Sequence, residues 1–277
     1  MSNPEATPRG SPLHYVVLIL LSAACLLPLV ILFYTSVKTQ AQIFSTSWSW
    51  LIVPTMDNYT SVIQNNNIER YMGNSLKISL AATLITLMLG TMCAYAMARF
   101  RFLGREPLSY STLILRTLPP AVLAVPVFVI WQAWGIGDTL SGVVLVYVAL
   151  NLPFTIWLLY GFIDQLPIEL EEAAAIDGCG PFRVFYKIVL PLLKPGLAAA
   201  AIFTFRLAWN EFILSFILTN RITRTLPASI SNYITDTGVQ WGEIMAAGML
   251  IALPPLIFTF VAAKQIITGL TAGAVKG

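Results

Sequence analysis

Residues 164–183 read DQLPIELEEAAAIDGCGPFR and form a polar interruption between two long apolar runs. Pro167 suits the start of a helix, and the three glutamates after it fall in the first turns, where the helix dipole favours negative charge. Gly178 and Gly180 end this helix, and Pro181 can open a second one. Because a plain turn between helices needs only a few residues, this segment predicts two short helices that protrude as a compact unit.

The composition indicates what this unit protrudes from. Of the 277 residues, 57% are hydrophobic and 10% are charged, and the mean hydropathy is +0.77. Soluble domains carry about 25% charged residues. The composition therefore excludes a soluble globular enzyme, a disordered chain and a coiled coil, and it favours an all-α membrane protein.

The apolar runs predict six transmembrane helices. They cover residues 13–37, 74–98, 107–134, 140–163, 195–219 and 244–263. The first run could be misread as a cleaved signal peptide, but it is longer than the usual apolar segment and lacks a clear cleavage site. The third run is interrupted by Arg116 and by the prolines Pro119, Pro120 and Pro126.

The basic residues predict the orientation of these helices. With both termini inside, nine lysines and arginines lie in inner segments and four in outer loops, which favours cytoplasmic termini. The inner set is Arg9, Arg99, Arg101, Arg105, Arg183, Lys187, Lys194, Lys264 and Lys276, and the outer set is Lys38, Arg70, Arg221 and Arg224. The net charge of +3 includes no basic block that would indicate nucleic-acid binding.

Several kinds of chemistry are disfavoured. The three cysteines and the one histidine have no metal-ligand spacing, and we expect no metal site and no catalytic residues. No phosphate-binding G-x-x-x-x-G-K-[ST] motif occurs, so we expect no cofactor on this chain. If nucleotide hydrolysis drives the protein, another subunit performs it.

Two roles remain open for the 164–195 loop. It could lie on lipid headgroups as an amphipathic hairpin, or it could be a docking surface for another protein. The early glutamates count against the lipid interpretation because the inner leaflet is anionic.

The same loop carries a family resemblance. Glu172-Ala173-Ala174, Gly178, Ile188 and Leu190-Pro191 have the residues and spacing of the EAA motif, and the loop resembles that of permease subunits of bacterial ABC importers. Trp209-Asn210-Glu211-Phe212 and the tail at residues 269–277 resemble the MalG-like, carbohydrate-uptake branch. The sequence departs from the usual pattern at Cys179 and Arg206.

The resemblance implies a type I ABC importer permease fold and a set of contacts. Residues 1–12 would be a cytoplasmic N-terminus, 13–70 the first helix and outer loop, 71–267 the transmembrane core and 268–277 a C-terminal tail. A coupling helix would meet a cytoplasmic ATPase, and the flexible tail would reach the ATPase dimer. The coupling residues would be Glu172, Ala173, Ala174, Asp177 and Gly178, and the tail contacts Gly273, Lys276 and Gly277.

The resemblance also implies the partners. This chain would pair with a homologous second permease, two ATPase subunits that bind ATP and Mg²⁺, and an extracytoplasmic solute-binding protein. The solute would be a sugar, glycoside or polyol. For the tail, a disordered terminus is the alternative.

Ionisable residues inside the predicted helices have two interpretations. Arg116 and Arg206 lie at similar depth, and Asn210 lies one turn from Arg206 on nearly the same helix face. Glu211 is offset around that helix from Asn210, and Asn151 in the fourth helix is a further candidate for the polar lining. Such residues usually face the protein interior or a cavity. Arg116 or Arg206 could pair with Glu211, or with a carboxylate of a partner subunit, and only fix packing. Alternatively they line the translocation cavity, where two arginines against one glutamate favour a negatively charged carbohydrate.

Two rival functions remain. A stand-alone secondary transporter would show internal repeats and need no docking loop, and we find no repeat. A membrane enzyme would need clustered reactive side chains at one membrane depth, and none is evident. Co-elution of an ATPase and a second permease would separate these possibilities.

Overall fold

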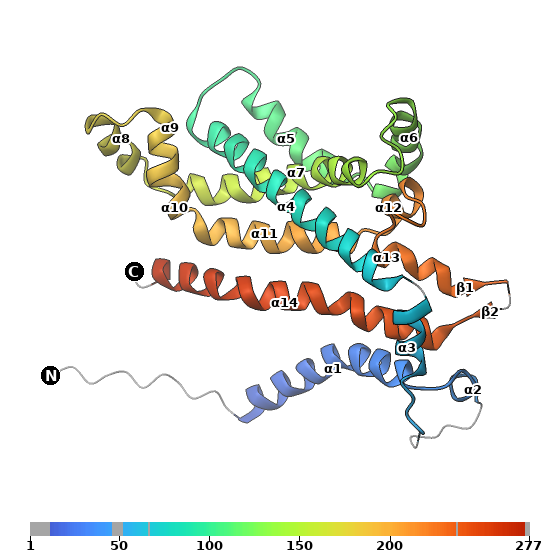
Figure 1. Cartoon of the computed structure of the whole chain (residues 1–277). Coiled ribbons are helices and arrows are strands. Elements are labelled where there is room, and N and C mark those ends of the chain that lie inside the picture. The colour runs from blue at the N-terminus through green and yellow to red at the C-terminus, as the bar shows by residue number, and fades with distance from the viewer. Residues whose placement is uncertain (1–11, 46–51, 66, 237, 275–277) are drawn as a thin grey trace. The chain divides into compact units, whose positions relative to one another are not determined.

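The computed structural model describes residues 12–45, 52–65, 67–236 and 238–274. It contains four helices that are long and apolar enough to cross a membrane, in α1 (Pro12–Ser36), α4 (Ile68–Arg99), α7 (Leu140–Asp164) and α14 (Trp241–Ala274). Two bent helix pairs raise the number of spans to six if each pair crosses once. The predicted all-α membrane fold is confirmed (Figure 1).

The chain divides into two compact units. The first contains α1, α2 (Gln40–Ile43), α3 (Asp57–Asn65), the paired strands β1 (Ile234–Thr235) and β2 (Gly238–Val239), and the start of α14. Within it, the Asn58 amide donates to the carbonyls of Ser36 and Lys38, each at 2.8 Å. The Ser61 hydroxyl donates to Glu243 at 2.9 Å, which ties α3 to α14. The residues that follow α1 are therefore held by side chains of α3.

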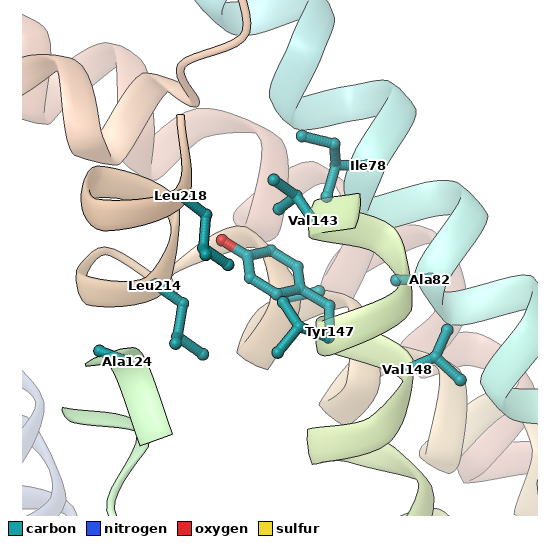
Figure 2. Close-up of a cluster of buried hydrophobic side chains, with 10 residues drawn as sticks. Ile78, Ala82, Ala124, Val143, Tyr147, Val148, Leu214 and Leu218 are labelled. Carbon is teal, nitrogen blue, oxygen red and sulfur yellow. The ribbon is translucent and has the colours of Figure 1, made fainter. Parts of the chain in front are cut away.

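The second unit is built on α4, α7 and α11 (Lys194–Trp209), which pack against one another (Figure 1). Its other elements are α5 (Arg105–Arg116), α6 (Pro120–Ala133), α8 (Glu169–Ile176), α9 (Pro181–Val184), η1 (Phe185–Val189), α10 (Leu190–Leu192), α12 (Ile213–Leu218), α13 (Leu226–Ser229) and η2 (Ile230–Tyr233). Figure 2 shows Tyr147 of α7 among side chains of α4 and α12, including Ile78, Leu214 and Leu218. These side chains pack α7 against α4 and α12.

The α4–α7 contact is close because small residues line it. A Cβ atom added at Gly90 of α4 would lie 2.8 Å from the Cγ2 of Thr155 on α7. Thr155 is fully buried, and its hydroxyl lies 3.0 Å from that of Thr204 on α11. Small residues let membrane helices approach, and hydroxyls then link them. Gly90 and this hydroxyl pair together position the three central helices.

The third predicted helix is not continuous. Residues 107–134 form α5 and α6, which are separated at Pro119 and joined at a sharp bend. Proline has no N–H to donate and disfavours helical backbone in the residue before it. The consecutive prolines Pro119 and Pro120 therefore end one helix and start another.

The fifth predicted helix, residues 195–219, is also wrong as a single element. It breaks at Asn210–Phe212 between α11 and α12. The Asn210 amide donates to the Arg206 carbonyl at 2.9 Å, while the Glu211 carboxylate accepts the N–H groups of Leu214 and Ser215. The Glu211 side chain thus takes two N–H groups that a continuous helix would pair with backbone carbonyls.

The C-terminal segment differs from the prediction as well. We expected the last helix to end at residue 263 and a flexible tail from Gly269, whereas α14 continues to Ala274. Glycine in a helix interior costs about 1 kcal/mol relative to alanine, which the helix-forming residues between the glycines offset. Residues 1–11, Lys276 and Gly277 lie outside the described residues.

Candidate functional site

The loop between α7 and α11 folds as two short helical segments, as predicted. α8 begins at Glu169 and ends before Gly178, whose φ of +81° is a conformation that favours glycine. The second segment opens at Pro181 and continues through η1 and α10, and the chain then bends by 74° into α11. The loop therefore changes direction at one glycine and again at Leu193.

The predicted coupling residues share one helix and its C-terminal turn. Glu172, Ala173 and Asp177 are exposed, and Gly178 has open space around its Cα. Ala174 is buried. The exposed residues leave one side of α8 accessible, whereas Ala174 faces the rest of the loop.

Apolar side chains flank this accessible side. Ile176 is 87% exposed and Phe182 is 81% exposed, and Tyr186 is also exposed. Exposed apolar residues that adjoin charged ones mark interaction surfaces more often than isolated ones do. Together they make a mixed apolar and acidic surface at the end of the loop.

The opposite side of α8 is fixed by a buried ion pair that sequence reasoning missed. Arg99 Nε, at the end of α4, donates to Glu171 Oε1 at 2.6 Å, and the two side chains are 10% and 11% exposed. The Tyr95 hydroxyl donates to Glu171 Oε2 at 2.8 Å. Arg99 Nη2 also donates to the carbonyls of Ile163 and Leu166, at 3.0 and 2.9 Å. We call Tyr95, Arg99 and Glu171 the α8 clamp.

The α8 clamp joins three elements through one guanidinium group. Arg99 binds α8 through Glu171 and binds the end of α7 through backbone carbonyls. A buried ion pair offsets its desolvation cost only when further hydrogen bonds satisfy the charges, and both charges here have such bonds. The clamp therefore attaches α8 to the ends of α4 and α7.

Glu211 does not pair with an intramembrane arginine among the described residues; its carboxylate binds groups on α7 and α12 instead. Its carboxylate accepts the N–H of Leu214 at 3.0 Å, the N–H of Ser215 at 3.1 Å and the Tyr147 hydroxyl at 3.0 Å. Within the described residues, no ion pair joins Glu211 to Arg116 or Arg206. The predicted pairing of an arginine with Glu211 is therefore wrong: Glu211 instead accepts N–H groups in the first turn of α12, where the helix dipole favours a negative charge.

The two predicted cavity asparagines also bond locally. Asn151 is buried and its amide donates to the Tyr147 carbonyl at 2.7 Å, one turn earlier in α7. Asn210 is exposed and bonds the Arg206 carbonyl. The hydrogen bonds of both asparagines are therefore made within their own helices.

The two arginines of the predicted cavity set are both exposed. Arg206 lies exposed in the last turn of α11, and Arg116 lies exposed in the last turn of α5. The guanidinium carbon of Arg116 lies 4.4 Å from the centroid of the Phe154 ring on α7, a cation–π contact.

At the other end of the unit, Asp138 joins two loops. Its carboxylate accepts the Asn220 backbone N–H at 2.7 Å, the Asn220 amide at 2.9 Å and the Thr223 hydroxyl. Burial opposes the charged form, but the hydrogen bonds from Thr223 and Asn220 and the nearby Arg224 charge outweigh it and lower the pKa of Asp138. Asp138 thus fixes the turn before α7 to the segment after α12.

This arrangement predicts an acid-dependent stability. Because the folded-state pKa is lowered, the contribution of Asp138 is fully present above about pH 4 and is lost as the pH falls through the lowered pKa. We expect Asp138→Asn to destabilise the purified protein by about 1 kcal/mol at pH 6. The melting-temperature difference between wild type and variant should shrink towards pH 3, and a constant difference would contradict the assignment.

No group of His, Cys, Asp or Glu in the described ranges is arranged to hold a metal ion.

Comparisons with known proteins identify similar chains. The family model described as "Binding-protein-dependent transport system inner membrane component" matches residues 86–271. The trehalose transport system permease protein SugB of Mycobacterium tuberculosis (strain CDC 1551 / Oshkosh) is 36% identical, over 91% of this chain and 93% of its own length. The sulfoquinovosyl glycerol transport system permease protein SmoH of Agrobacterium fabrum (strain C58 / ATCC 33970) is 32% identical, over 97% and 95%.

Solved structures share the fold at low identity. A chain of a bacterial ABC transporter involved in the import of the acidic polysaccharide alginate matches with a TM-score of 0.73 and 17% identity, over 94% of this chain and 99% of that one. A chain of the MetNI methionine ABC transporter matches with a TM-score of 0.61 and 16% identity, over 78% and 99%. These likenesses concern the fold alone.

Proposed function

Because this chain belongs to the family of binding-protein-dependent transport system inner membrane components, we propose that it forms half of the translocation pathway of an ATP-driven carbohydrate importer. It is a multi-pass inner-membrane protein. Relatives that cover nearly the whole chain are permeases named for trehalose, diacetylchitobiose and sulfoquinovosyl glycerol transport, which supports a sugar, glycoside or polyol as the solute.

The observation that carries the mechanism is the two-sided character of α8. One side exposes Glu172, Ala173 and Asp177, and the other is fixed by the α8 clamp. In our proposal Glu172, Ala173, Ala174, Asp177 and Gly178 contact a cytoplasmic ATPase subunit, which binds ATP and Mg²⁺. Movement of the ATPase then displaces α8, and the clamp passes that displacement to α4 and α7.

The remaining partners follow from the same proposal. Two ATPase subunits, a homologous second permease and an extracytoplasmic solute-binding protein complete the importer, and this chain performs no covalent chemistry. Both termini lie in the cytoplasm, as the excess of inner lysines and arginines favours. The C-terminal residues Gly273, Lys276 and Gly277 contact the ATPase dimer.

A crosslink at Ala173 tests the docking. Cys25, Cys93 and Cys179 are first replaced by alanine, since all three are free thiols. We expect Ala173→Cys to crosslink to an ATPase subunit in native membranes in most copies, because the exposed α8 surface is covered by that subunit. Glu69→Cys, exposed at the opposite end of α4, is the matched control and should give no such product. Absence of an ATPase adduct at Ala173→Cys contradicts the importer assignment.

Purification separates the importer from its rivals. An importer half should co-elute with an ATPase and a second permease, whereas a secondary transporter or a membrane enzyme should purify without an ATPase. Thermal shift of the cognate binding protein against a sugar panel then identifies the solute.

A further inference from the structure

Two arginines inside the membrane helices have no acidic partner among the described residues. Arg116 and Arg206 are exposed on α5 and α11, and the carboxylate of Glu211, the only acidic group in the predicted cavity set, is bound to α12 and Tyr147. The ion pair that the described chain forms is Arg99 with Glu171. A positive charge within a membrane helix usually faces the protein interior or a water-filled cavity. The two arginines therefore require either an aqueous path or an anion beside them.

A pair of phenylalanines places the two arginines in one region. The Arg116 guanidinium lies over the Phe154 ring, and the Phe154 ring meets the Phe203 ring edge-on at 5.7 Å between centroids. Phe203 lies three residues before Arg206 in α11, so these two side chains share a helix face. α5, α7 and α11 therefore contribute a continuous row in which an arginine flanks each end of an aromatic pair.

The positions along the helices agree with this row. Arg116 and Arg206 lie about 16 and 18 Å from the starts of α5 and α11, and Phe154 lies about 15 Å before the end of α7, at 1.5 Å per residue. The loop of α8 to α10 joins the end of α7 to the start of α11, and Arg105 at the start of α5 donates to the Tyr160 hydroxyl near the end of α7 at 3.2 Å. The three distances are therefore measured from the same end of the unit. The four side chains thus lie near one depth.

The chemistry of this row indicates its ligand. Arginine binds carboxylate, sulfate, sulfonate and phosphate groups through paired N–H donors. Aromatic rings offer the apolar faces of sugar rings a surface to pack on. We propose that Arg116 and Arg206 bind, one after the other, the acidic group of an anionic carbohydrate as it passes through the importer, with the exposed Phe203 beside its sugar ring. This inference rests on the proposed function and narrows its substrate class.

The first test uses the cognate binding protein, which selects the solute. The panel pairs a glucuronosyl disaccharide and a sulfoquinovosyl glycoside with trehalose and chitobiose as neutral probes, and inorganic sulfate serves as a free anion. We expect the acidic glycosides to raise the melting temperature at lower concentrations than the neutral ones, which bind more weakly, and sulfate not to raise it. If only neutral sugars bind, the anionic-substrate inference is overturned. The importer assignment is not affected by that result, because the Ala173→Cys crosslink tests it separately.

The second test locates the recognition in this chain. In the complete importer reconstituted in proteoliposomes, Arg116→Gln and Arg206→Gln should each raise the KM for the acidic solute about tenfold or more, the effect of losing one charged hydrogen-bond partner. Uptake of a neutral analogue with the same sugar skeleton, measured at a saturating concentration, should change less than twofold. Arg116→Lys and Arg206→Lys should restore part of the loss, and Arg70→Gln, an exposed charge at the start of α4, is the control.

Two outcomes overturn the inference. Equal losses for the acidic and the neutral solute would show that the arginines act on transport in general. Loss of co-purifying second permease in Arg116→Gln or Arg206→Gln would show that they pair with a carboxylate of that subunit.

Discussion

Arg99→Ala is expected to abolish solute transport and to lower the stability of the protein by about 3–5 kcal/mol, the cost of breaking a buried ion pair. The substitution leaves the Glu171 carboxylate buried beside Tyr95 and removes the donor from the Ile163 and Leu166 carbonyls. α8 then loses its attachment to α4 and α7. Thermal unfolding of the purified protein and uptake by the reconstituted importer measure the two effects.

The control must separate the clamp from a general loss of charge. Glu169 is exposed in the same helix, so Glu169→Ala should change stability by less than about 0.5 kcal/mol, whereas Glu171→Ala should reproduce the loss seen in Arg99→Ala. If the clamp transmits force, Arg99→Lys should retain the ATPase subunit and hydrolyse ATP while transporting less solute per ATP. Equal behaviour of the two glutamate variants would contradict the assignment.

Gly90→Leu is expected to damage the contact between α4 and α7 severely. Even a Cβ atom at this position approaches Thr155 to 2.8 Å, and Thr155 is fully buried and bonded to Thr204. The larger side chain must push α4 away from α7, at a cost of about 1–3 kcal/mol or more. We expect a lower melting temperature and loss of uptake.

Gly73→Leu in the same helix is the matched control. An added Cβ there has nothing within 4 Å, and leucine has a better helix propensity than glycine. The control should therefore be neutral or stabilising by up to about 1 kcal/mol. Similar melting temperatures for Gly90→Leu and Gly73→Leu would show that the α4–α7 contact tolerates separation.

Local sequence signals predicted the α8 loop well. Pro167, Gly178 and Pro181 act on the backbone of their own neighbours, so the start of α8, its end and the start of α9 follow from them directly. The α8 clamp could not be found in this way, because Arg99 and Glu171 are 72 residues apart and no local rule pairs them. One hint was available: Glu171 lies three residues before the buried Ala174, on the same face of α8.

The breaks within the membrane helices were harder to predict. In the hydropathy pattern Asn210 and Glu211 are only two polar residues in an apolar run. That pattern cannot show that their side chains bond the backbone of α11 and α12. The role of Glu211 depended on Tyr147, which lies on another helix. The reach of α14 to Ala274 was missed because we gave the glycines more weight than the helix formers between them.

The α8 clamp also has a consequence for biosynthesis. Arg99 is synthesised 72 residues before Glu171. When α4 is first inserted, the Arg99 guanidinium at its end therefore has no carboxylate to pair with. During that interval the cation is available to hold its end of the helix on the cytosolic side, in the orientation proposed above. Arg99 forms its ion pair only after Glu171 has been synthesised. The same arginine would then act first as an orientation signal during insertion and later as the contact that holds α8.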